Sequence, residues 1–306
     1  MCNNPPMQVI EVHNLVKRYD DVVAVDGIDI SIEAGEIFAL LGPNGAGKST
    51  TVEILEGHRS ATTGTVSVLG FDPSTRHRSF RERIGIVLQE TAVEGSLTVV
   101  EAINVYGRMY PNQRPTRELI EIVGLEEKSD ARIKTLSGGQ RRRLELALGI
   151  VGDPDLIFMD EPTTGFDPSA RRQAWTIVQN LTSLGKTVLL TTHYMDEAQV
   201  LADRVAVIAE GRIVAEGTPE SLGGREDAAS VISFNPEEAS LDGLPADKIQ
   251  VGENGRVTLE SKTPTRTVHD VTGWAVARGI ELSDLTVARP SLEDVYLQLT
   301  AGDGDE

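Results

Sequence analysis

Three features are scarce in this sequence: cysteine, aromatic side chains and long apolar runs. The single cysteine, Cys2, lies near the N-terminus without a partner, which excludes a disulfide framework and is typical of a reducing compartment. Its position would suit lipidation, but no apolar signal segment precedes it, so we interpret it as an incidental terminal residue. No run of about eighteen apolar residues occurs, and we therefore expect no segment that spans a bilayer.

Basic residues are also scarce, because 29 Lys and Arg stand against 47 Asp and Glu, for a formal net charge of −18. A polyanion needs a basic footprint, so this balance argues against nucleic acid as a main partner. It also argues against direct adsorption to an anionic membrane surface. A surface adapted to high salt would have the same composition as one that is merely soluble.

The clearest motif is a glycine-rich loop between a predicted buried strand, Ile37–Leu41, and a helix-compatible run, Thr50–Leu55. Glycines let backbone N–H groups surround phosphate oxygens, and the helix N-terminus adds positive potential. Lys48 would bind the β- and γ-phosphates, and the Ser49 hydroxyl would bind Mg²⁺. The sequence therefore predicts a nucleoside triphosphate site formed by Gly42, Pro43, Asn44, Gly45, Ala46, Gly47, Lys48, Ser49 and Thr50.

Two further apolar runs end in polar residues that suit phosphate chemistry. The predicted strand Leu156–Met159 ends in Asp160 and Glu161, an arrangement that rarely arises by accident. Asp160 could orient Mg²⁺, and Glu161 could accept a proton from an attacking water or orient it. His193 follows the predicted core strand Thr187–Thr192, at the edge where open α/β sheets hold their ligands.

Other candidates have two interpretations on the residues alone. Gln89 ends the predicted strand Ile84–Leu88, either at the ligand edge or simply facing solvent. Ser137 and the glycines after it precede a predicted helix, Arg141–Ile150, as a helix cap or as a second phosphate-binding terminus. The triple arginine Arg141–Arg143 resembles a nucleic-acid motif, but in so acidic a chain we interpret it as a solvated helix face.

The 306 residues, 40% of them hydrophobic, are enough for two domains. Alternating strands are predicted before the loop, then helices over 98–110 and 116–125, and a hairpin over 204–217. Tyr19 could stack on adenine or cover a sheet edge, and composition favours the second. From about residue 220 the chain predicts a separate α+β module, with a hairpin at Asn254-Gly255, a helix over 267–278, a strand over 282–287 and a closing helix capped by Ser291.

Over about residues 8–220 the order and spacing of these motifs resemble the ATP-binding subunit of ABC transporters. The family's signature stands as Leu136-Ser137-Gly138-Gly139-Gln140, its Q-loop glutamine as Gln89, its catalytic glutamate as Glu161 after Asp160, its D-loop as Gly165-Phe166-Asp167-Pro168, its switch histidine as His193 and its adenine-stacking aromatic as Tyr19. Phe166 departs from the usual leucine. The tail, Ser291–Tyr296, resembles the small C-terminal domain of daunorubicin-type drug-resistance exporters.

The resemblance implies an α/β fold of the P-loop NTPase class, with a mixed β-sheet core, an antiparallel β subdomain, a helical subdomain over about 90–150 and a small C-terminal α+β domain. The implied domains are residues 1–219 and 220–306. It further implies that two copies, or this chain and a homologous subunit, close head-to-tail around two ATP molecules, with Ser137, Gly138, Gly139, Gln140 and Asp167 contributing to the nucleotide site. Ser49, Gln89 and Asp160 would hold Mg²⁺, and His193 would contact the γ-phosphate.

A family member without a membrane span must work through separate transmembrane permease subunits, so the resemblance implies a cytoplasmic ATPase held on the inner face of the membrane. The stretch between Gln89 and Leu136 is the expected docking surface. We expect an exporter of drugs or lipophilic compounds; an importer ATPase, or a soluble ABC ATPase acting on DNA or ribosomes, is the alternative. Against the last, fewer than fifty residues separate Gln89 from Leu136, which leaves no room for a coiled coil, and there is one P-loop. A ligand-sensing role for the tail also stays open.

Overall fold

The computed structural model describes residues 7–87, 93–225, 227–236, 240–245, 249–252 and 255–301. The chain divides between Pro219 and Glu220 into two compact units, each with its own sheets and core. The predicted Q-loop residue Gln89, with its neighbour Leu88, and Asn254 of the predicted C-terminal hairpin lie outside the described residues.

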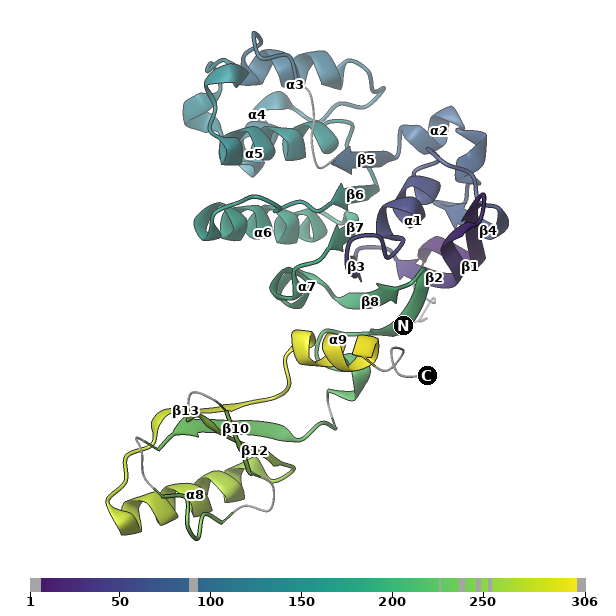
Figure 1. Cartoon of the computed structure of the whole chain (residues 1–306). Coiled ribbons are helices and arrows are strands. Elements are labelled where there is room, and N and C mark those ends of the chain that lie inside the picture. The colour runs from purple at the N-terminus through teal and green to yellow at the C-terminus, as the bar shows by residue number, and fades with distance from the viewer. Residues whose placement is uncertain are drawn as a thin grey trace, which may run out of the picture. The chain divides into compact units, whose positions relative to one another are not determined.

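The first unit is built on a six-stranded mixed sheet whose strand order is β5-β6-β7-β3-β8-β9 (Figure 1). All neighbouring strands are parallel except the final pair, where β9 runs antiparallel to β8. The strands are β3 (Ile37–Leu41), β5 (Ile84–Val87), β6 (Leu156–Asp160), β7 (Thr187–Thr192), β8 (Arg204–Ala209) and β9 (Arg212–Gly217). The central strands β3 and β7 are buried along their whole length because both faces of the sheet are covered.

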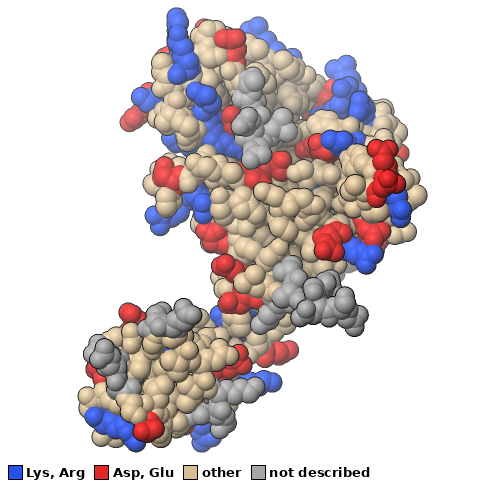
Figure 2. Space-filling model, viewed as in Figure 1, with Lys and Arg blue, Asp and Glu red and all other residues tan. Residues whose placement is uncertain are grey.

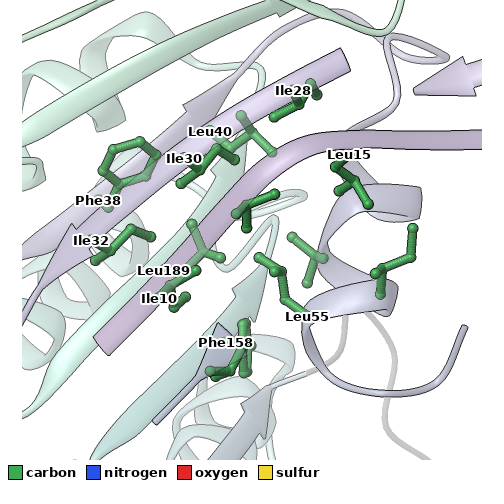
Figure 3. Close-up of a cluster of buried hydrophobic side chains, with 14 of the residues drawn as sticks. Ile10, Leu15, Ile28, Ile30, Ile32, Phe38, Leu40, Leu55, Phe158 and Leu189 are labelled. Carbon is green, nitrogen blue, oxygen red and sulfur yellow. The ribbon is translucent and has the colours of Figure 1, made fainter. Parts of the chain in front are cut away.

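A second, antiparallel sheet has the order β2-β1-β4, with β1 (Gln8–Tyr19), β2 (Val22–Glu33) and β4 (Thr63–Val68). The alternating residues that precede the loop form two long strands, β1 and β2, joined by a tight turn. Their inward side chains meet those of the mixed sheet in one core, in which Ile10 and Ile32 pack near Phe158 and Leu189 (Figure 3). Helix α1 (Lys48–Leu55) is clamped into this core by Val52 and Leu55.

The helical subdomain gathers α3 (Val99–Gly107), α4 (Thr116–Ile122) and α5 (Gly138–Gly149) beyond β5 (Figure 1). Helix α5 of this subdomain packs closely against β5 of the sheet. A Cβ built on Gly85 of β5 would lie only 2.1 Å from the carbonyl oxygen of Gly149 in α5. Helix α5 begins three residues earlier than the sequence predicted, since Ser137 caps it. The remaining first-unit helices are α2 (Arg78–Arg81), α6 (Pro168–Ser183), α7 (Met195–Leu201) and the 3₁₀ turns Pro73–Thr75, Glu126–Lys128 and Ile133–Thr135.

The second unit is a four-stranded antiparallel sheet, of order β11-β12-β10-β13, with helix α8 (Pro264–Arg278) packed against it. Its core includes Phe234, Leu259 and Trp274. The predicted hairpin, strand and helices are present as β11 (Ile249–Val251), β12 (Val257–Ser261), α8, β13 (Ser283–Ala288) and α9 (Leu292–Ala301); β10 (Ser230–Asn235) and the turn Leu222–Gly224 were not predicted. Ser291 caps α9 reciprocally with Asp294, as predicted.

The face drawn in Figure 2 carries acidic and basic side chains in small interspersed groups. Among its described residues the Lys and Arg side chains form no continuous stripe.

A cavity of about 420 Å³ lies where α1 ends beside β5 and the helical subdomain; its lining includes Glu56, His58, Arg76, Tyr106, Tyr110 and Glu145. Glu56 is 7% exposed, and its Oε2 lies 3.1 Å from the Nδ1 of His58. Burial, with repulsion from Asp160 and Glu53, raises the pKa of Glu56 to about 8. The carboxyl group therefore stays protonated in the folded chain at pH values where an exposed glutamate is ionised.

We predict that Glu56→Gln raises the free energy of unfolding above that of the native chain, and that this gain is larger at pH 8.5 than at pH 5. Between the unfolded pKa of 4.5 and the folded value of about 8, the folded state holds a proton that the unfolded state has lost, so stability falls as the pH rises. At pH 8.5 the glutamine variant should be more stable than the native chain by on the order of 3 kcal/mol. This is less than the full pKa shift implies, because nearby His58 and solvent in the cavity reduce the cost of ionising the buried carboxyl group.

Urea unfolding monitored at several pH values measures this difference. Glu127→Gln, which changes an exposed carboxyl in the turn Glu126–Lys128, is the matched control and should follow the native chain. A constant difference between Glu56→Gln and the native chain from pH 5 to pH 8.5 would contradict the prediction.

Candidate nucleotide site

Three neighbouring strands of the mixed sheet, β6, β7 and β3, end at the same edge and place the predicted residues there. Leu41 lies opposite Thr192, and Asp160 lies opposite Thr191. The glycine-rich loop, Glu161 and His193 therefore leave three adjacent strands at one level. This is the edge where parallel sheets bind ligands.

The loop from Gly42 to Gly47 has a backbone that only glycine can supply at two of its positions. A Cβ on Gly42 would lie 2.3 Å from the carbonyl oxygen of Ile208. Gly47 has φ +105°, and a Cβ there would lie 2.5 Å from the carbonyl oxygen of Ala24. The β8–β9 turn supports the loop from behind, since Gly211 N donates to Ala46 O at 3.0 Å and Gly211 O accepts from Asp26 N at 2.8 Å.

Lys48 is 5% exposed and its ammonium group turns back into the loop, donating to Gly42 O at 2.7 Å and Pro43 O at 3.1 Å. Its Nζ lies 4.0 Å from Glu161 Oε1. Burial lowers the pKa of Lys48, and the charges of Glu161 and Asp160 oppose that shift. The structure thus brings the predicted phosphate-binding lysine and the predicted catalytic glutamate to one point.

The rest of the loop separates into exposed and buried positions. Pro43, Asn44 and Gly45 face solvent, as does Ser49 on the first turn of α1, whereas Ala46 is buried and Thr50 is half-buried. The hydroxyl of Thr51 donates to Gly47 O at 2.9 Å and steadies the start of the helix. The exposed N–H groups and the Ser49 hydroxyl are accessible to a phosphate and its cation.

Glu161 has a backbone conformation that is unusual for a residue with a side chain, with φ +45°. Its N–H donates to Thr191 O at 3.2 Å and to Thr191 Oγ1 at 3.1 Å. Its carboxylate lies 3.2 Å from His193 Nδ1 through Oε1 and accepts from Thr164 Oγ1 at 3.1 Å through Oε2. Hydrogen bonds therefore hold both the backbone and the side chain of Glu161, and one of its carboxylate oxygens lies beside the ring of His193.

Thr191 was not predicted as a site residue, yet its hydroxyl also donates to Asp160 Oδ1. Two threonines after the apolar residues of this strand, Thr191 and Thr192, were the available signal. Asp160 is thereby oriented with one carboxylate oxygen engaged by protein.

The described residues contain no cluster of three His, Cys, Asp or Glu side chains that could hold a metal by themselves. Ser49 on the first turn of α1 and Asp160 at the end of β6 instead offer two oxygen ligands. This set fits Mg²⁺, which takes few protein ligands and completes its shell with phosphate oxygens and water.

The signature segment forms a capped helix start. Ser137 Oγ accepts from Gln140 N at 3.3 Å, and Gln140 Oε1 accepts from Ser137 N at 3.0 Å. The N–H groups of Gly138 and Gly139 have no acceptor among the described residues. In the described part of the chain, no hydrogen bond or ion pair joins this segment to the P-loop or to Glu161.

The interpretation of Arg141–Arg143 as a solvated helix face is wrong for Arg142, while Arg141 is exposed and Arg143 is half-buried. Arg142 is buried, and its guanidinium donates to Pro162 O at 3.1 Å and pairs with Glu145 at 2.9 Å. Arg143 donates to Gly124 O at 2.7 Å. The acidic composition gave no information about an arginine that binds backbone carbonyls inside the fold.

Asp167 of the D-loop caps α6, accepting from Ser169 N at 2.9 Å and Ala170 N at 3.0 Å. These two bonds hold the pKa of Asp167 below its usual value. A Cβ built on Gly139 would lie 3.5 Å from the Cβ of Ala170, so the signature helix starts beside the D-loop helix. Phe166, where the family usually has leucine, is half-buried.

Tyr19 lies at the end of β1 and is 36% exposed. Lys17 Nζ lies 4.9 Å and Arg59 Cζ 5.6 Å from its ring centroid, so cations already contact the ring. Adenine stacking on this ring stays a prediction.

Comparisons with known proteins agree with this geometry. Residues 25–164 match the profile of the ABC transporter family, and residues 230–291 match a profile described as the C-terminal domain of ABC transporter domain-containing protein-like sequences. Nod factor export ATP-binding protein I of Burkholderia lata is 38% identical over 96% of this chain and 98% of its own length. The daunorubicin/doxorubicin resistance ATP-binding protein DrrA of Streptomyces peucetius is 38% identical over 99% of this chain and 96% of its own length.

Solved structures share the fold of the first unit. An ATP-binding cassette of an ABC transporter in its ADP conformation has a TM-score of 0.63 at 27% identity and covers 70% of this chain and 92% of its own. A bacterial ABC transporter cassette described as dimeric has a TM-score of 0.59 at 24% identity, over 68% of this chain and 98% of its own. The predicted P-loop NTPase fold is confirmed, and the chain belongs to the ABC transporter family as an ATP-binding, ATP-hydrolysing subunit.

Proposed function

We propose that this chain powers an exporter of drugs or lipophilic compounds by closing as an ATP-dependent head-to-tail dimer. The observation that supports the dimer is that the candidate phosphate-binding groups lie in two separate places in the chain. Lys48 and Glu161 meet at one end of the sheet, whereas the N–H groups of Gly138 and Gly139, without an acceptor among the described residues, have no bond to that place. A second copy, or a homologous subunit, turned head-to-tail would bring its signature helix to the γ-phosphate.

We assign the site residues roles that their positions support. Lys48 leaves the carbonyl oxygens of its own loop and binds the β- and γ-phosphates, while Tyr19 stacks on adenine. Glu161 orients the attacking water and accepts its proton, and His193, already 3.2 Å from Glu161, contacts the γ-phosphate. The partner's Ser137 to Gln140 and Asp167 complete the enclosure.

Mg²⁺, when bound through Ser49, Asp160 and the predicted ligand Gln89, would neutralise charge on the phosphates. The oxygen donors of Ser49 and Asp160 support this assignment. ATP then holds the two surfaces together, and hydrolysis weakens their contact because the bridging phosphate is lost.

We further propose that separate transmembrane permease subunits dock on the stretch between Gln89 and Leu136 and hold the chain on the inner face of the membrane. Membrane-spanning helices are absent from the described part of this chain. Within the proposed docking stretch, the apolar side chains of Val105 and Met109 are 44% and 69% exposed, so both are available to a partner. Both residues belong to the region of α3, beside the cavity lined by Tyr106 and Tyr110.

Glu161→Gln should bind ATP with native affinity, dimerise in its presence and hydrolyse it on the order of 10²–10³-fold more slowly, because the amide cannot accept the proton of water. Lys48→Ala should instead lose at least about tenfold in ATP affinity, because a charge-assisted contact to phosphate is gone. Fluorescent nucleotide binding measures ATP affinity, light scattering measures dimerisation, and phosphate release measures hydrolysis.

Near-native hydrolysis by Glu161→Gln would remove this residue from catalysis. A Glu161→Gln chain that stays monomeric at saturating ATP, alone and with any homologous subunit, would remove the dimer. Tight ATP binding by Lys48→Ala would contradict the role of the loop lysine.

The direction of transport can be measured in inside-out membrane vesicles that contain this chain and its permease. An exporter should accumulate a fluorescent lipophilic compound such as an anthracycline in the vesicle lumen when ATP is supplied outside, whereas vesicles with Lys48→Ala should not. ATP-dependent release of preloaded compound from the same vesicles would indicate an importer and contradict the proposal. The export relatives named above, which cover 96% and 99% of this chain, support the first outcome.

A further inference from the structure

A buried carboxyl group lies directly behind the site and has no role in the chemistry described so far. Glu197 is on α7, four residues after His193, and has no exposed surface. Its Oε1 accepts from Thr163 Oγ1 at 2.7 Å and from Trp175 Nε1 at 3.1 Å. Burial raises the pKa of Glu197, and its hydrogen-bond donors oppose that shift.

These two partners and Glu197 itself belong to the three segments that carry Glu161, Asp167 and His193. Thr163 is two residues after Glu161, on the loop that leaves β6. Trp175 is on α6, the helix that Asp167 caps. Because Glu197 itself extends the segment of His193, one carboxyl oxygen ties together the segments of Glu161, Asp167 and His193.

The loop that carries Glu161 is held on its other side by the signature helix, where Arg142 Nε donates to Pro162 O at 3.1 Å. The two neighbouring residues, Pro162 and Thr163, are thus each held by a different helix, α5 and α7. This matters because Glu161 has a left-handed backbone conformation, which persists only where the surrounding structure enforces it.

Two further contacts join α6 to the start of α7. The Arg171 guanidinium lies 4.3 Å from the ring of Tyr194, and its Nη1 lies 3.2 Å from Asp196 Oδ2. The Tyr194 ring in turn packs against His193, with 4.0 Å between ring centroids. The histidine is therefore supported from the same helix pair that Glu197 joins.

For stability alone, a carboxyl group is a poor choice in this position. An apolar side chain of similar size would avoid the desolvation cost of Glu197, and a buried ionisable group adds little net stability even when it is hydrogen-bonded. Only a hydrogen-bond acceptor at this position can hold the Thr163 hydroxyl in a fixed place relative to α7.

We propose that Glu197 is a positioning residue for ATP hydrolysis, which sets the loop of Glu161 against the helix behind His193 so that both side chains reach the nucleotide together. The inference rests on the hydrolytic roles proposed above for Glu161 and His193. Glu197 has no contact with nucleotide in this scheme and acts through Thr163 and Trp175.

The test compares Glu197→Ala with Glu197→Gln in the full chain. Alanine removes the acceptor and should lower kcat at least tenfold, while KM and the affinity for ATP stay within twofold, because the loop lysine is untouched. Glutamine keeps an oxygen that accepts from Thr163 and Trp175, so it should restore kcat to within about threefold of the native value. Val200→Ala, which trims a 46% exposed side chain on the same helix, is the control and should leave kcat unchanged.

Thr163→Val gives a second measurement if the alanine variant does not fold. It should lower kcat as Glu197→Ala does, Thr163→Ser should restore it, and the double variant Thr163→Val with Glu197→Gln should lose no more than Thr163→Val alone. Native kcat in Glu197→Ala or in Thr163→Val, or equal losses in Glu197→Ala and Glu197→Gln, would overturn the proposal. If Glu161→Gln stops turnover while Glu197→Ala does not, only the positioning role fails.

Discussion

The arrangement that everything else depends on is the parallel order of β6, β7 and β3, whose carboxyl ends meet at one edge. Three segments distant in the chain there deliver a lysine, a glutamate and a histidine. Lys48 and His193 both lie within 4.0 Å of Glu161 Oε1. Phosphoryl transfer needs positioning and electrostatic stabilisation more than covalent chemistry, and a rigid, buried sheet supplies that positioning.

Around this edge the protein fixes backbone rather than merely side chains. The carbonyl oxygens of Ala24 and Ile208 leave no space for a Cβ on Gly47 and Gly42, and Thr191 binds the backbone of Glu161 while it orients Asp160. The helical subdomain reaches the same place through Arg142, which binds the carbonyl oxygen of Pro162. The signature helix and the hydrolytic loop are consequently one connected structure within a single chain.

Much of this was predictable from the sequence because local patterns determined it. Apolar strands that end in polar residues, and a glycine-rich loop between a strand and a helix, located β3, β6, β7 and the sheet edge where the candidate residues lie. The helix α6 was not predicted, although Asp167-Pro168 and the spacing of Ala174, Ile177, Val178 and Leu181 were typical helix signals. The buried state of Arg142 and Glu197 could not be predicted, because it depends on which distant carbonyl or hydroxyl groups the fold brings to them.

The β8–β9 turn has a consequence for how the protein is made. Gly211 carries the hydrogen bonds to Ala46 and Asp26 that support the nucleotide loop from behind. A ribosome releases the loop early but the turn only much later, after β6 and β7. The nascent chain therefore contains the glycine-rich loop before the turn that supports it, and these two hydrogen bonds can form only after the hairpin has been synthesised.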